Sequence, residues 1–180
     1  MDAAVVQSAR ASKFEQYQAL IVSTAAFTVC FAVWTLFSIV GIEIKQELGL
    51  DGAEFGLLVA TPVLTGALSR LFLGLLSDKF GGRRVFALLM LLTAGAVYAV
   101  STVSSYAMFL LAALGLGFAG GSFAVGVSYI SSWFDRARQG AALGIFGAGS
   151  IGTAITTFGA PLLVSAFGWR ETGQIYAAVL

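Results

Sequence analysis

The feature that most constrains this chain is a series of long apolar runs, each close to the length needed to cross a lipid bilayer. Hydrophobic residues make up 58% of the sequence and charged residues only 11%. A hydrocarbon core of ~30 Å needs ~20 apolar residues per helix. Lipid offers no hydrogen-bond partner to an open backbone, so runs of this length predict helices. The composition excludes an ordinary water-soluble domain.

Five membrane spans and the beginning of a sixth are expected along the chain. The five cover residues 17–42, 55–77, 85–101, 106–133 and 140–167, and the sixth starts near Gln174 and is cut off at Leu180. Residues 1–16 are expected to form a cytoplasmic N-terminal segment, and residues 17–180 a transmembrane helix bundle. The predicted fold class is therefore all-α, a polytopic membrane helix bundle with an unfinished last span.

A cleavable signal peptide is the alternative explanation of the first span, because Arg10 and Lys13 precede it. The apolar region of a signal peptide is ~7 to 15 residues long, and this run is longer. We therefore expect a permanent membrane anchor. The single cysteine, Cys30, lies within it and the chain has no histidine, so neither a disulfide framework nor a metal site is expected.

The distribution of Lys and Arg predicts a cytoplasmic N-terminus. Seven of the ten would lie on one side of the membrane, namely Arg10, Lys13, Lys79, Arg83, Arg84, Arg136 and Arg138. Lys45 and Arg170 fall on the opposite side, and Arg70 is left over inside a span. Cytoplasmic loops keep the positive charges. The basic residues are thus distributed according to membrane topology. With a net charge of only +1, the chain shows no basic patch for nucleic acid.

Arg70 is the only charge deep inside any predicted span. A cation at that depth costs roughly 2.5 to 3.5 kcal/mol even on lenient insertion scales, and no carboxylate in the spans can neutralise it. Gly66, Arg70 and Gly74 are four residues apart and share one helix face. Snorkelling is the alternative, but Asp78 at the span end is about 12 Å away at ~1.5 Å per residue, beyond the full reach of the side chain. The expected counter-charge is an anion that comes and goes.

Two hexapeptides, residues 115–120 and 147–152, fit the dinucleotide pattern G-x-G-x-x-G. That fingerprint needs a preceding strand and a soluble βαβ unit, whereas both hexapeptides lie inside apolar runs. We therefore expect small-residue stripes that let helices approach closely. The stripes are Gly140, Gly144 and Gly147; Gly149, Gly152, Thr156 and Gly159; and Gly117, Gly121, Ala124 and Ser128.

The loop after the second span has the pattern Gly-x-x-x-Asp-x-x-Gly-Gly-Arg-Arg, from Gly74 through Asp78 and Gly82 to Arg83 and Arg84. It combines a carboxylate at a helix end, glycines for a tight turn, and guanidinium groups that can pair with carboxylates across a helix seam. In this position the pattern resembles the loop signature of the major facilitator superfamily. The resemblance implies that these five residues form a conformational latch, which stabilises the outward-facing state.

Three segments make the chain similar to the nitrate/nitrite porters of that superfamily. They surround Arg70 in the second span, Phe123 in the fourth, and the glycine-rich stretch with Gly149 and Ser150 in the fifth. The resemblance implies that Arg70 binds the anion, that Phe123 packs on it, and that Gly149 and Ser150 contribute to the site. Ser122 and Ser150 stand where family members commonly carry asparagine, which offers more donors than a hydroxyl.

The resemblance implies the N-terminal six-helix half of a transporter in the bacterial inner membrane, surrounded by lipid. That protein would move nitrate or nitrite by alternating access, in uptake, export or exchange, with a missing or separate C-terminal six-helix half. No cofactor is expected, and without a catalytic constellation the chain is not expected to be an enzyme. Protons are a second candidate partner, although no complete span has a central Asp, Glu or His, which favours anion exchange. The alternative hypothesis is a truncated half-transporter, partner-dependent or non-functional, that acts only as a membrane-inserted helix bundle.

Overall fold

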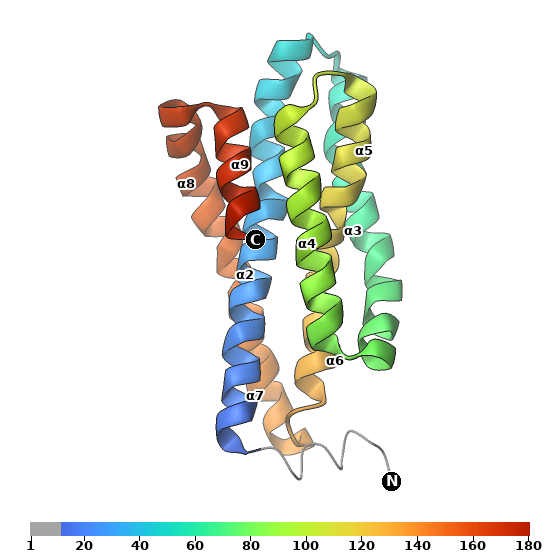
Figure 1. Cartoon of the computed structure of the whole chain (residues 1–180), viewed down its shortest axis with the longest axis vertical. Helices are drawn as coiled ribbons and strands as arrows, with labels where there is room; N and C mark the ends of the chain where they lie inside the picture. Colours follow the sequence, from blue (N-terminus) through green and yellow to red (C-terminus); the bar gives the residue numbers. More distant parts are fainter. Residues whose placement is uncertain (1–11) are drawn as a thin grey trace.

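The computed structural model describes residues 12–180, and over that range it consists of helices joined by short turns (Figure 1). Residues 1–11, which include Arg10 and most of the predicted N-terminal segment, lie outside the described residues. The order of elements is α2 (Lys13–Leu48), α3 (Gly52–Phe80), α4 (Gly82–Thr102), α5 (Tyr106–Gly117), η1 (Phe118–Gly121), α6 (Ser122–Ser131), α7 (Arg136–Gly147), η2 (Ala148–Ser150), α8 (Ile151–Phe167) and α9 (Trp169–Val179).

Within the described residues, five helical segments are long and apolar enough to cross a membrane. They are α2, α3, α4, the continuous segment formed by α5, η1 and α6, and the one formed by α7, η2 and α8. The prediction of an all-α bundle of membrane helices is confirmed at this level. Each of the last two segments contains one turn of 3-10 helix, and each turn overlaps one of the glycine hexapeptides.

The helices extend beyond the apolar runs because capping groups, not hydropathy, set their ends. The carboxylate of Asp51 accepts hydrogen bonds from the N–H groups of Ala53 and Glu54, both at 2.8 Å, and so begins α3. Gly168 has φ 91° and allows the turn into α9. Helix α9 therefore begins at Trp169, ahead of the span expected from near Gln174. The charges of Arg170 and Glu171 interrupt the apolar pattern but not the helix.

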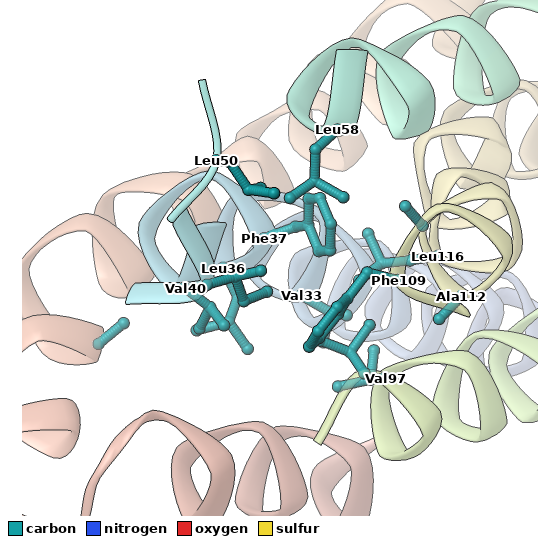
Figure 2. Packing of buried hydrophobic residues seen from close by; sticks show 14 residues of the cluster. Val33, Leu36, Phe37, Val40, Leu50, Leu58, Val97, Phe109, Ala112 and Leu116 are labelled. Carbon is teal, nitrogen blue, oxygen red and sulfur yellow. The ribbon is translucent and has the colours of Figure 1, made fainter. Parts of the chain in front are cut away.

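Two clusters of buried apolar side chains hold the bundle together. One lies between α2, α3, α4 and α5, where Phe37, Leu58, Val97, Phe109 and Leu116 interdigitate (Figure 2). The other is built around Phe27 and Phe146. Many leucines and phenylalanines on the outer faces of the helices are exposed, as expected where lipid replaces water.

Small residues set the closest helix contacts. Helix α2 packs along α8, α3 along α5, and α4 along α9. A Cβ added at Gly152 would collide with the backbone carbonyl of Thr28, and the hydroxyl of Thr156 donates to the carbonyl of Ala32 at 2.9 Å. The stripe that contains Gly152 and Thr156 is therefore a packing seam, as predicted.

The stripe of Gly140, Gly144 and Gly147 differs from this. No atom of the described chain, beyond each glycine's own surroundings in the helix, lies within 4 Å of a Cβ built at any of the three. The prediction of a packing seam there is wrong for the contacts within residues 12–180. The spacing alone could not distinguish a face that packs within this chain from one that stays open.

Candidate functional site

Helix α3 carries Arg70 to a point where it crosses the 3-10 turn η1 at close range. A Cβ built on Gly66 would lie 3.0 Å from the carbonyl oxygen of Gly117 and 3.5 Å from the Cα of Gly120. One on Gly117 would lie 2.6 Å from the Cβ of Thr65. Only glycines permit this approach, which confirms the packing role predicted for Gly117. Arg70 follows Gly66 by one helical turn and so lies beside this crossing.

The guanidinium group of Arg70 is held by a hydrogen bond at its Nε atom. Its Nε–H donates a hydrogen bond of 3.0 Å to the carbonyl oxygen of Gly120. Neither Nη1 nor Nη2 of Arg70 has a hydrogen-bond or ion-pair partner among the side chains and backbone of residues 12–180. The residue is exposed in the described chain. It therefore offers a fork of N–H donors and a positive charge that this part of the molecule leaves unneutralised.

Phe123 lies one turn beyond Gly120 in the same helical segment, and its ring packs with aromatic rings from α2 and α7. Its ring stacks on Phe146 with centroids 5.8 Å apart and contacts Phe27 at 5.6 Å. Phe27 and Phe146 are fully buried, whereas 42% of Phe123 is exposed. Residues three apart on a helix share a face, so one face presents both the carbonyl that holds Arg70 and a partly open aromatic ring.

Gly149 and Ser150 come from η2 and differ in their surroundings. Gly149 is buried against α2, since a Cβ there would lie 2.6 Å from Cδ1 of Phe27. Ser150 is exposed. Because Phe27 contacts both Gly149 and Phe123, the fourth and fifth membrane helices meet through this ring. A contact of either Gly149 or Ser150 with an anion stays a prediction.

Ser122 does not face a site in the described chain. It is fully buried, and its hydroxyl donates 2.6 Å to the carbonyl oxygen of Ala119 within its own turn. Of the two serines that stand in place of the common asparagine, only Ser150 is open for contact.

The loop between α3 and α4 brings two of the five predicted latch residues, Asp78 and Gly82, against α6. Asp78 accepts a hydrogen bond from the hydroxyl of Ser128 on α6. Gly81 has φ 88°, which allows the tight turn. A Cβ on Gly82 would collide with the side chain of Tyr129. These glycines thus serve the turn and the close helix contact.

The side chains of the remaining latch residues form no hydrogen bond or ion pair with residues 12–180. Arg83 and Arg84 are exposed, and the ion pair formed within residues 12–180 joins Arg170 to Glu47 instead. No atom of the described chain lies within 4 Å of a Cβ built on Gly74, outside its own helix. The role of Gly74, Arg83 and Arg84 as a latch stays a prediction.

Sequence reasoning missed three contributors to this region: Trp34, Phe27 and the carbonyl of Gly120. The signal for Trp34 was present, because tryptophan in membrane proteins favours the two interfaces and this one lies mid-span. The carbonyl of Gly120 could not have been found, since any residue offers one. Within residues 12–180 no group of three or more His, Cys, Asp or Glu side chains is placed to hold a metal ion.

Comparison with known proteins identifies the family. The family model described as Major Facilitator Superfamily matches residues 22–180. The chain belongs to the major facilitator superfamily. Its resemblance to nitrate/nitrite porters is confirmed by relatives. It is 40% identical over 178 residues to the probable nitrate/nitrite antiporter NarK1 of Thermus thermophilus, covering 92% of this chain and 40% of the relative.

Two other relatives within the superfamily carry related names. The probable nitrate/nitrite transporter NarK2 of Mycobacterium tuberculosis is 40% identical over 164 residues, covering 89% of this chain and 42% of the relative. The nitrite extrusion protein of Bacillus subtilis is 34% identical over 165 residues, covering 92% and 42%. The chain thus spans about two fifths of the length of the curated relatives it matches.

Membership of the superfamily fixes the class of protein. Together with the five membrane-length helices, it makes this chain a multi-pass protein of the bacterial inner membrane. The superfamily and these relatives consist of transporters, and the chain is not an enzyme.

Proposed function

We propose that this chain forms part of a transporter that moves nitrate and nitrite by alternating access, and that Arg70 binds the anion. The observation that carries the proposal is the guanidinium of Arg70. It lies within a membrane-length helix, is held at Nε by Gly120, and has no partner at Nη1 or Nη2 within residues 12–180. A cation at membrane depth needs a counter-charge, and relatives named for nitrate and nitrite suggest which anion supplies it.

The chemistry of the two groups is complementary. Nitrate is planar and delocalised, and a planar guanidinium can donate two parallel hydrogen bonds to it. The half-open ring of Phe123 gives such a weakly hydrated anion an apolar face, so that it binds without being held too tightly. Ser150, exposed on η2, is the proposed hydroxyl donor, and Gly149 its neighbour in the site.

The orientation we propose has the N-terminus in the cytoplasm. The beginning of α2, the α3–α4 turn and the beginning of α7 lie at the same end of the bundle (Figure 1), and this end carries Lys13, Lys79, Arg83, Arg84, Arg136 and Arg138. Positive charges favour the cytoplasmic side. The latch from Gly74 to Arg84 then lies at the cytoplasmic end, where Asp78 and the two arginines can exchange partners as the protein opens and closes.

The proposed site needs further helices. Arg70 and Phe123 are both exposed in the described chain, and transporters of this class bind substrate near the bilayer midplane between two repeats. We propose that the described helices form an N-terminal six-helix half and that a C-terminal half, in the same or another polypeptide, closes the site and provides a second cation. The alternative is a half-transporter that only inserts.

The test is nitrate uptake by the complete gene product in liposomes. Arg70→Lys keeps the charge but loses the fork, so we expect uptake to fall roughly 10- to 100-fold, the effect of losing a hydrogen bond to a charged group. Arg138→Lys, at an exposed position near the start of α7, is the matched control and should leave uptake unchanged. Uptake by Arg70→Lys equal to that of wild type, at equal abundance, would remove the role given to Arg70.

A further inference from the structure

We propose that Trp34 is a positioning residue for Arg70: the indole sets the crossing of α3 and η1 that fixes the guanidinium. This inference rests on the proposed function of Arg70. A Cβ on Gly120 would lie 3.2 Å from Cε2 of Trp34 and 3.3 Å from the Cα of Gly66. A Cβ on Gly66 would lie 3.7 Å from Nε1 of Trp34. The edge of the indole therefore lies against the backbones of both Gly66 and Gly120, where α3 and η1 cross.

The indole is itself held in place on two sides. Its Nε1–H donates a hydrogen bond of 3.4 Å to the carbonyl oxygen of Pro62 on α3. Its ring lies 5.4 Å from the ring of Phe31, one turn earlier on α2. Trp34 also packs against both apolar clusters of the bundle. Trp34 is thus a side chain of α2 that donates to α3 and lies with its ring edge close to η1.

The consequence for Arg70 follows from the hydrogen bond at Nε. The carbonyl of Gly120 accepts that hydrogen bond at 3.0 Å, so the position of the η1 backbone decides the orientation of the guanidinium plane. With Nε occupied, the remaining free edge is the pair Nη1 and Nη2. That edge can bind a planar oxyanion through two parallel hydrogen bonds. Displacement of η1 by a fraction of an ångström would weaken the anchor and let the fork rotate.

The experiment compares Trp34→Phe with wild type in nitrate uptake by the complete protein in liposomes. Phenylalanine keeps an aromatic ring but lacks the N–H donor and the outer part of the indole that touches Gly120. We expect the KM for nitrate to rise about tenfold, the change expected when a hydrogen bond to a charged group is weakened. We expect kcat and the amount of folded protein to change little.

Trp133→Phe is the matched control, because it makes the same chemical change in the turn that follows α6. The Nε1 of Trp133 has no hydrogen-bond partner in the described structure. The hydrogen bond of Arg70 Nε goes to Gly120, and the atoms nearest a Cβ built on Gly120 belong to Trp34 and Gly66, not to Trp133. Its KM for nitrate should equal that of wild type. Gly120→Ala is the second variant: its methyl group would press on Trp34 and Gly66, and it should raise KM in the same direction as Trp34→Phe.

The possible results separate this inference from the one on which it rests. Wild-type protein that takes up no nitrate would remove the proposed function. Wild-type uptake with an unchanged KM in both Trp34→Phe and Gly120→Ala would overturn only the role of Trp34. A merely structural role predicts a lower thermal stability and abundance with an unchanged KM, and that outcome also contradicts the proposal. If Trp34→Phe does not accumulate, the KM of Gly120→Ala decides.

Discussion

At the scale of single residues, the positions of glycines decide how closely the helices of this bundle pack. Gly152 on α8 lies so close to the carbonyl of Thr28 on α2 that a methyl group has no room. Lipid supplies no hydrophobic force between helices, so close van der Waals contact and interhelical hydrogen bonds must hold them. The hydrogen bond from Thr156 to Ala32, at 2.9 Å, lies along the same seam.

Gly152→Ala should therefore separate α8 from α2. Inserting a methyl group into a packed contact costs typically 1 to 3 kcal/mol, and we expect a loss of about that size in the stability of the purified protein. The measurement is the thermal unfolding midpoint in detergent. Gly95→Ala is the control, since Gly95 is exposed in the middle of α4 and a Cβ there meets nothing within 4 Å outside its own helix. Equal midpoints for the two variants would contradict this account.

At the scale of helices, Arg170 joins the beginning of α9 to the ends of two others. Its Nη2 contacts Oε1 of Glu47 at 2.6 Å, and its Nη1 donates to the carbonyls of Ser101 and Val103 at 3.1 and 3.2 Å. These carbonyls lie at the C-terminal end of α4, where backbone acceptors lack helical partners and a cation is favoured. Trp169 adds a hydrogen bond of 3.2 Å to the other oxygen of Glu47.

Arg170→Lys should loosen this end of α9, because an ammonium group cannot bridge the carboxylate and both carbonyls in the same way. We expect a loss of about 1 to 2 kcal/mol in stability, limited by the partial exposure of both side chains. Glu47→Gln should cost less, and the double variant should cost less than the sum of the two, since the groups interact directly. Arg136→Lys, exposed at the start of α7, serves as control. Strict additivity would show that the pair is not coupled.

The sequence predicted the helices better than their interruptions. Runs of apolar residues located the five membrane-length segments because lipid forces the chain to satisfy its backbone internally. The same runs hid the 3-10 turns at Phe118–Gly121 and Ala148–Ser150, since backbone geometry within a glycine-rich helix depends on tertiary contacts. Arg70 could be identified from its charge alone. Its hydrogen bond to the carbonyl of Gly120 and the close approach of Trp34 to Gly120 depend on which helices cross, and residue spacing does not encode that.

At the scale of the whole molecule, the positions of the acidic residues bear on how transport is driven. Glu43, Glu47, Glu54 and Asp78 lie near the ends of the membrane-length helices, and the chain has no histidine. Proton-coupled transporters commonly place such groups within the membrane. Within residues 12–180, the membrane-length helices thus carry a cation at Arg70 and no Asp, Glu or His near their middle. On the proposed role of Arg70, we expect exchange of one anion for another.

Exchange predicts that nitrite inside liposomes drives nitrate uptake by the complete protein. In such an exchange, an anion bound in each direction would neutralise the proposed site at Arg70. The empty site with its unpaired cation would then not have to reorient across the membrane. We expect internal nitrite to raise the initial rate of nitrate uptake several-fold, with the membrane voltage clamped. An inward proton gradient imposed alone should leave that rate unchanged. Liposomes with the Arg70→Lys protein measure the background. Uptake that follows the proton gradient and ignores internal nitrite would instead establish symport and point to a titratable group outside the described helices.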